Sequence, residues 1–101
     1  MADAWVYLLR CADGSLYTGW TTDLSKRMAA HAAGTASRYT RSRLPVALVL
    51  AVPQSDRSSA RKEEVRIKRL RRTEKLALVA AAGIPSGGVP PAPSEVVPVT
   101  P

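Results

Sequence analysis

The feature that most constrains the fold is a pair of strand-like segments joined by a very short turn. Residues 5–11 (WVYLLRC) and 16–21 (LYTGWT) are rich in β-branched, aromatic and aliphatic side chains. Asp13 and Gly14, which favour turns, lie between the two segments. This pattern predicts an antiparallel β-hairpin close to the N-terminus.

Two registers of this hairpin are compatible with the sequence, and they place its two tyrosines differently. A two-residue turn at positions 13–14 would put Tyr7 and Tyr17 on opposite faces, because side chains alternate along a strand. A three-residue loop at positions 12–14, with its glycine in the left-handed conformation, would put Tyr7, Tyr17 and Gly19 on one face. The functional interpretation below requires the three-residue loop.

A first helix is expected directly after the hairpin. Thr22 can cap it, Asp23 would lie in its first turn, and Gly34 can end it. Leu24 and Met28, four residues apart, would supply the side of the helix that faces the core.

The same helix carries Arg27 and His31, also four residues apart, on an adjoining stripe. Residues at this spacing lie on one side of a helix, so both can face one point beside the sheet. Residues 35–43 are expected to form a loop, rich in basic and hydroxyl side chains and without an acid, which suits phosphate contact. Its candidate nucleic-acid-binding residues are Arg38, Tyr39, Arg41 and Arg43.

A third strand and two further helices are expected after this loop. Residues 46–52 form an unbroken apolar run between two prolines, which predicts a strand buried on both faces at the centre of a small sheet. A helix is expected over about residues 58–71, and Thr73 would cap a last helix that ends at Gly83. The buried sides of these two helices are expected to hold Ala60, Ile67 and Leu70, and then Leu76, Val79 and Ala80.

Two adjacent glutamates, Glu63 and Glu64, fall near the buried side of the expected helix at 58–71. An unpaired carboxylate is costly at the margin of a core, so each needs an arginine or a metal ion as partner. The helical projection does not choose between them.

The chain changes composition at residue 83. Residues 83–101 hold six prolines, three glycines and a single charged residue, Glu95, which predicts a disordered proline-rich tail. The folded part is therefore expected to be one domain over residues 1–82.

The net charge is +7, from 15 Lys and Arg against eight Asp and Glu, with a pI near 10.3. Nine of the basic residues lie between Arg57 and Lys75, and we include Arg61 and Lys68 among the candidate nucleic-acid contacts. Such an excess on a small domain favours a nucleic-acid partner over a merely solubilising surface. No strongly apolar amphipathic face accompanies it, which argues against a membrane surface.

Cysteine and hydropathy patterns set the expected compartment. No apolar run approaches the roughly 20 residues that span a membrane, and no secretory signal precedes the hairpin. The single Cys11 cannot form an internal disulfide, and with only one histidine it cannot build a tetrahedral zinc site from soft ligands alone. We expect a cytoplasmic monomer.

Segments 6–8 (VYL) and 17–19 (YTG) resemble the two halves of the GIY-YIG signature of a nuclease family. Arg27 stands at the spacing of that family's helix arginine, His31 follows one turn later, and a glutamate-bearing helix comes after the third strand. The resemblance covers residues 5 to about 80 and is greatest to the short, stand-alone bacterial members.

The resemblance implies an α/β (α+β) sandwich with a small three-stranded antiparallel sheet flanked by helices. It also implies a metal-dependent endonuclease that hydrolyses phosphodiester bonds in structured or single-stranded DNA, as in DNA repair. By position it assigns Tyr7, Tyr17, Arg27 and His31 to catalysis, Gly19 to the motif glycine and Glu64 to the metal.

These residue types suit that chemistry. Mg²⁺ or Mn²⁺ takes few protein ligands, so one carboxylate such as Glu64 can hold it together with waters and substrate. Arg27 offers a forked guanidinium to the scissile phosphate. Tyr17 or Tyr7 could accept a proton from water, or orient it, if nearby positive charge lowers a phenol pKa from about 10. His31 is an alternative base.

The sequence departs from the family pattern at several positions. Val6 replaces the first motif glycine, Thr18 replaces an aliphatic residue, no lysine follows Gly19, and the chain contains no asparagine. Slow catalysis, or a heavier use of His31, would follow. Two other function classes therefore stay open: a nucleic-acid-binding module with weak or no cleavage, and an interaction domain for an acidic partner.

Overall fold

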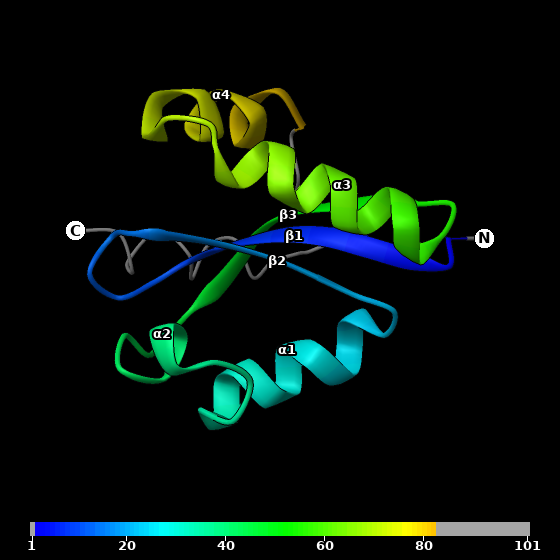
Figure 1. Ribbon diagram of the computed structural model, residues 1–101. Coiled ribbons are helices and arrows are strands. Elements are labelled where there is room, and N and C mark those ends of the chain that lie inside the picture. Colours follow the sequence, from blue (N-terminus) through cyan, green and yellow to red (C-terminus); the bar gives the residue numbers. More distant parts are fainter. Residues whose placement is uncertain (1, 83–101) are drawn as a thin grey trace.

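The computed structural model of the chain describes residues 2–82, so the predicted tail at 83–101 lies outside the described part. Within residues 2–82 the elements are β1 (Ala4–Arg10), β2 (Leu16–Thr21), α1 (Leu24–Ala33), α2 (Arg38–Arg41), β3 (Ala47–Gln54), α3 (Arg57–Lys68) and α4 (Arg72–Ala82). Figure 1 shows the sheet between two helical layers, α1 with α2 on one side and α3 with α4 on the other. The three-stranded antiparallel α+β sandwich is confirmed.

The hairpin has the register that brings its two tyrosines to one face. Tyr7 pairs with Gly19 and Leu9 pairs with Tyr17 across the β1–β2 ladder. Residues directly opposite each other share a face, and so do residues two apart on one strand. Tyr7, Tyr17 and Gly19 therefore lie on the same face of the sheet.

The loop between β1 and β2 fixes this register. Gly14 has a φ of 85°, and its N–H donates to the Cys11 carbonyl oxygen at 2.9 Å. The Cys11 N–H donates in turn to the Ser15 carbonyl oxygen at 2.9 Å, which closes a three-residue loop. Asp13 Oδ1 accepts from the Ser15 N–H at 3.0 Å and from its hydroxyl at 2.6 Å. The chain thus adopts the three-residue alternative.

The strand order is β2-β1-β3, so the prediction that residues 46–52 form the central strand is wrong. β1 is central, and β3 lies at an edge that includes Pro53. An edge strand tolerates proline because the missing N–H faces away from the ladder. The strand is half-buried along most of its length, with only Val49 and Leu50 of its residues buried, so its predicted burial on both faces is only partly met. An apolar run carries no information about which edges of a strand are paired.

The main core lies between the sheet and the layer of α3 and α4. A register shift between Leu8 and Leu9 marks a bulge in β3, where Val49 and Leu50 are both buried. A bulge lets two successive residues face one residue of the neighbouring strand, which accounts for this pair. The buried cluster consists of Ala4, Val6, Leu8, Val49, Leu50, Ala60 and Ile67.

The start of α1 differs from the sequence prediction. Asp23 is the N-cap, and its carboxylate accepts the Lys26 N–H at 3.0 Å, so Thr22 is not the cap. Gly34 ends the helix with φ of 79°, as predicted.

The core-facing side of α1 also differs. Leu24 and Met28 are only half-buried, and the buried residue of the helix is His31. The side of α1 that packs most closely on the sheet is therefore the one that carries His31, and not an apolar stripe.

A short helix interrupts the expected loop at residues 35–43. Ser37 caps α2, and its side-chain oxygen accepts the Thr40 N–H at 3.1 Å. Thr40 is the buried residue of this single turn.

The last two helices have different bounds from those predicted. Asp56 caps α3 by accepting the Ser59 N–H at 2.7 Å, and the helix ends at Lys68 rather than near residue 71. The Glu74 carboxylate accepts the Arg71 N–H at 2.8 Å before α4, so Thr73 lies inside the first turn and is not the cap. The predicted end at Gly83 lies outside the described residues.

The predicted buried side is confirmed for α3 and only in part for α4. Ala60 and Ile67 are buried and Leu70 packs partly buried against the core. On α4, Val79 packs against the core as predicted, whereas Leu76 is half-buried and Ala80 is exposed. Leu78, which was not predicted, also packs against the core.

Cys11 is buried as a free thiol, and burial raises its pKa. Among residues 2–82, no helix combines the length and apolarity needed to cross a membrane.

Candidate active site

Tyr7 lies at the centre of the candidate site because it belongs to the central strand. Its side chain is fully buried, and its hydroxyl lies 2.8 Å from Nε2 of His31 on α1. A buried hydroxyl without a partner costs about 1–3 kcal/mol, so this hydrogen bond holds strand and helix in a defined relation.

His31 is bonded at both ring nitrogens by residues from different elements. Besides the contact to Tyr7, its Nδ1 lies 2.9 Å from Oγ1 of Thr40 on α2. His31 is 1% exposed and Thr40 is 0% exposed, so neither contact competes with bulk water. Two partners at opposite ends fix the orientation of the imidazole ring.

Gly19 provides the space that the Tyr7 hydroxyl occupies. A Cβ at this position would lie 2.6 Å from Tyr7 Oη and 2.7 Å from Tyr7 Cζ, and 3.2 Å from Cε2 of Tyr17. The first two distances are shorter than any ordinary contact. The motif glycine is therefore required by the close approach of the opposing tyrosine.

Tyr17 forms the outer side of the aromatic cluster. It is half-buried, and its ring centroid lies 6.4 Å from that of Tyr7 and 5.4 Å from that of His31, edge-on to the imidazole. The ring of Tyr39, from α2, stacks on Tyr17 at 5.8 Å with an interplanar angle of 28°. Tyr17 is thus the motif tyrosine nearer to solvent.

Arg27 lies one turn before His31 and acts electrostatically on Tyr7. Burial raises the pKa of Tyr7 to about 12, and the neighbouring Tyr17 adds to this rise. The Arg27 side chain opposes it, by a hydrogen bond to the phenol and by its charge, while the Glu64 charge raises the pKa further. The positive charge of Arg27 alone does not lower the pKa of Tyr7 below its ordinary value, because burial is the larger effect.

His31 responds to the same surroundings in the opposite direction. Burial, followed by the positive charge of Arg27, lowers the pKa of its imidazole below 6.5. The ring is therefore neutral at pH 7 and retains one nitrogen lone pair for accepting a proton.

The structure distinguishes the two adjacent glutamates of α3. Glu63 is committed to Arg66, which donates to its two oxygens at 3.0 and 2.6 Å. Glu64 is more buried, with a side chain 18% exposed, and makes a single longer ion pair with Lys68 at 3.5 Å. Its carboxylate is therefore less engaged by the protein than the Glu63 carboxylate and has more capacity for coordination.

The donor set bears on the implied divalent metal ion. Among residues 2–82 no group of three or more His, Cys, Asp or Glu side chains could enclose an ion. The partly buried oxygen donors of Glu64 fit a hard ion that takes one protein carboxylate and completes its shell with waters and substrate phosphate.

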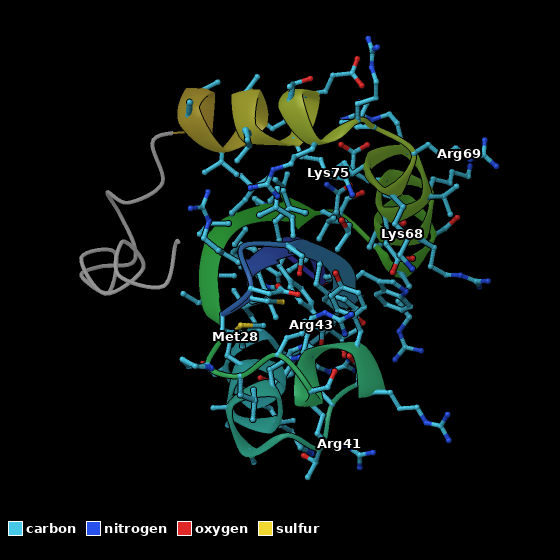
Figure 2. The ribbon with its side chains drawn as sticks, turned by 90° about the vertical axis from the view of Figure 1, so that its left-hand side faces the viewer. Met28, Arg41, Arg43, Lys68, Arg69 and Lys75 are labelled. Atoms are coloured by element: carbon cyan, nitrogen blue, oxygen red, sulfur yellow. The ribbon has the colours of Figure 1, made fainter. Side chains whose placement is uncertain are left out.

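The candidate nucleic-acid contacts lie in both helical layers. Figure 2 shows Arg41 and Arg43 in the layer of α1 and α2, and Lys68, Arg69 and Lys75 in the layer of α3 and α4. The exposed basic candidates are Arg38, Arg41, Arg61 and Lys68. These side chains can reach a phosphate without breaking the fold.

Arg43 and Tyr39 make contacts within the protein. Arg43 donates to Asp13 Oδ2 and to the Tyr39 carbonyl oxygen, each at 3.0 Å, and its guanidinium lies 3.8 Å from the centre of the Tyr39 ring. Tyr39 is 37% exposed but already stacks on Tyr17. These two residues tie α2 to the hairpin loop.

Thr40 and Ser37 complete the site and were not among the sequence candidates. Thr40 Oγ1 lies 2.9 Å from His31 and 3.1 Å from Ser37 Oγ. The available signal was Ser37, because serine is a residue type favoured at helix N-caps. That signal predicts a helical turn and gives no hint of the histidine.

Comparisons with known proteins bear on this geometry. The sequence model of the GIY-YIG catalytic domain matches residues 3–77. A UPF0213 protein of Natronomonas pharaonis is 48% identical over 79 residues, which are 78% of this chain and 93% of that protein. A UPF0213 protein of Clostridium perfringens is 45% identical over 80 residues, which are 79% of this chain and 86% of that protein.

A solved structure is similar as well. The solution NMR structure of the UPF0213 protein BH0048 from Bacillus halodurans is 41% identical in sequence, with a TM-score of 0.54. The match covers 81% of this chain and 87% of that chain.

Proposed function

Since this chain belongs to the GIY-YIG catalytic-domain family, we propose that it is a metal-dependent endonuclease that hydrolyses phosphodiester bonds in DNA. Structured or single-stranded DNA in repair is the proposed substrate. The observation that carries the proposal is the 2.8 Å hydrogen bond between Tyr7 and a neutral, buried His31, beside Gly19 and the half-buried Tyr17.

Hydrolysis requires a proton acceptor for the attacking water. With a pKa of about 12, Tyr7 cannot act as a base at neutral pH on its own. It can accept a proton from water if its own proton moves to Nε2 of His31, which then becomes an imidazolium. The hydroxide oxygen forms the new bond to phosphorus as the bond to the leaving oxygen breaks.

The remaining groups orient and stabilise the reacting phosphate. Arg27 would grip two phosphoryl oxygens with its forked guanidinium. Tyr17 would orient the water at the outer side of the cluster, and its ring would turn aside to open Tyr7, which has no exposed surface. Mg²⁺ or Mn²⁺, held by Glu64, would supply positive charge to the phosphate and the leaving oxygen.

A panel of single-stranded, duplex and branched DNA, incubated with and without Mg²⁺ or Mn²⁺, tests the proposal. We expect cleavage that depends on the ion and falls by about 100-fold or more in Tyr17→Phe and Glu64→Ala. Glu63→Ala is the matched control, since this neighbour is engaged by Arg66. Equal rates in Glu64→Ala and Glu63→Ala would exclude Glu64 as the metal ligand.

The second candidate is a nucleic-acid-binding module with weak or no cleavage. The net charge of +7 favours it, because charge supports binding whether or not the site reacts. Tight, salt-sensitive binding of DNA that stays intact with every ion would select this second function.

A further inference from the structure

Four side chains form one continuous hydrogen-bond chain behind the candidate site. The chain runs from Tyr7 Oη to His31 Nε2 at 2.8 Å, from His31 Nδ1 to Thr40 Oγ1 at 2.9 Å, and from Thr40 Oγ1 to Ser37 Oγ at 3.1 Å. Tyr7, His31 and Thr40 are all at most 1% exposed. Protein groups alone therefore decide which atom donates and which accepts.

At the Tyr7 end of the hydrogen-bond chain, only one assignment of donors and acceptors gives every donor a partner. The Tyr7 hydroxyl is fully buried, and the acceptor that it meets among the described residues is His31 Nε2 at 2.8 Å. Arg27, whose charge acts on the phenol, is a guanidinium and offers no acceptor. The Tyr7 proton must then go to His31 Nε2, which carries a lone pair only if the imidazole proton resides on Nδ1.

The contacts at the Ser37 end favour the same assignment of donors and acceptors. The Thr40 hydroxyl donates to the Ser37 carbonyl oxygen at 3.4 Å, and a carbonyl can only accept. The Ser37 hydroxyl oxygen already accepts the Thr40 N–H at 3.1 Å, so α2 itself sets the position of Thr40. With its proton turned toward Ser37, the Thr40 oxygen offers a lone pair to His31 Nδ1–H.

We propose that Thr40 is a positioning residue that holds His31 in the Nδ1–H tautomer, with the Nε2 lone pair directed at the Tyr7 hydroxyl. The opposite direction would leave the Tyr7 proton without an acceptor among the contacts of the described residues. When Nε2 takes a proton, the Nδ1–H bond to Thr40 persists unchanged. The imidazolium therefore forms without rearrangement of the other hydrogen bonds in this chain of side chains. The catalytic consequence rests on the proposed function, whereas the tautomer does not.

The sequence offers an unambiguous probe, because His31 is the only histidine of the full chain. Long-range ¹H–¹⁵N correlation spectra of the ¹⁵N-labelled full-length protein at pH 7.5 report which ring nitrogen carries the proton. We expect a protonated Nδ1 and an unprotonated Nε2 in the unmodified protein. A protonated Nε2 would overturn the proposal without any variant being made.

Two conservative variants test the role of the hydroxyl. Thr40→Ser keeps the oxygen and should retain the tautomer and the rate of DNA cleavage. Thr40→Val removes it, and we expect a mixed tautomer with kcat lower by about 10-fold and KM unchanged, as for other partners that orient a functional histidine. An unchanged tautomer in a folded Thr40→Val would overturn the proposal.

The spectra test the tautomer and the kinetics test the nuclease proposal, so a failure of one can be told from a failure of the other. An Nδ1–H tautomer in a protein that cleaves no DNA leaves the hydrogen-bond chain intact and contradicts the proposed nuclease. Should Thr40→Val not fold, the spectra of the unmodified protein and Thr40→Ser still decide the tautomer.

Discussion

Gly19 lies opposite Tyr7 on the neighbouring strand, and the Tyr7 hydroxyl fills the space of its missing side chain. We expect Gly19→Ala to lower the free energy of unfolding by about 1–3 kcal/mol, because a Cβ 2.6 Å from Oη forces the ring to shift. Urea unfolding measures the decrease. Nuclease activity should fall with it, since the same shift breaks the bond to His31.

Gly14→Ala is the control for that substitution. Gly14 has a φ of 85° in the hairpin loop, so alanine should cost about 1–2 kcal/mol through backbone strain. It leaves the space beside Tyr7 untouched, and we expect the activity of the folded protein to persist. An equal decrease of activity in both variants would assign the effect of Gly19→Ala to general destabilisation.

His31 also links stability to pH. Because burial and Arg27 hold its folded pKa below the ordinary value of 6.5, the unfolded chain binds more protons below about pH 6.5. The free energy of unfolding should therefore be constant above about pH 7 with respect to His31 and fall as pH drops toward 5. Urea midpoints measured from pH 8 to 5 test this.

His31→Gln should remove the dependence of the free energy of unfolding on pH between about pH 7 and 5. The carboxyls with lowered pKa, Asp13, Asp56 and Glu63, lose their contributions only below about pH 4.5, since their ordinary values are 3.8 to 4.5. A slope of the same size in His31→Gln would show that another group titrates there.

The individual site residues differ in how visible they are in the sequence. Tyr7, Tyr17 and Gly19 share a face through a local hairpin, and Arg27 and His31 share a helix, so simple periodicity brings them together. Thr40 reaches His31 only because the chain turns back after α1. A contact that depends on the chain folding back in this way leaves no periodic pattern in the sequence.

At the level of the elements, the N-cap of α1 gives a direct contrast between two adjacent residues. Asp23→Ala should lower the free energy of unfolding by about 0.5–2 kcal/mol, because the Lys26 N–H is left without its partner. Thr22→Ala should stay within about 0.5 kcal/mol of the unmodified protein. Thermal or urea unfolding of both variants measures the difference, and the reverse order would place the cap at Thr22.

Strand order is the element-scale property that the sequence did not reveal. An apolar run of β-branched residues indicates that both faces of a strand are covered, whereas the order in a sheet depends on which edges are paired. β3 has that apolar run and yet lies at the edge, while β1 with its polar-aromatic site face is central. Only Pro53 hinted at an edge.

The α2 turn was missed for a different reason. With four residues, Arg38–Arg41, it is shorter than any window over which helical periodicity can be detected. Its stability comes from the Ser37 cap and from the buried Thr40, which are tertiary and capping interactions rather than patterns.

At the scale of the whole molecule, the question is which helical layer meets the polyanion. We expect the double variant Arg38→Ala/Arg41→Ala to weaken DNA binding and to reduce the salt slope on single strands by about 0.7 for each phosphate that is no longer neutralised. These side chains are exposed on the layer that also carries Arg27 and His31. Binding titrations at several salt concentrations measure both quantities.

Arg69→Ala/Lys75→Ala removes the same charge from the opposite layer, which Figure 2 shows, and is the matched control. Its effect should be smaller. Equal effects would mean that the overall field of the molecule, rather than a defined surface, governs binding.

The single buried thiol has a practical consequence. Cys11 follows the central strand at the start of the hairpin loop, has no exposed surface, and has a pKa raised by burial. A thiol reagent can reach it only when the structure around the hairpin loop opens locally, so the labelling rate reports on those openings. Labelling of this thiol therefore measures local opening around the hairpin, and it requires no substitution.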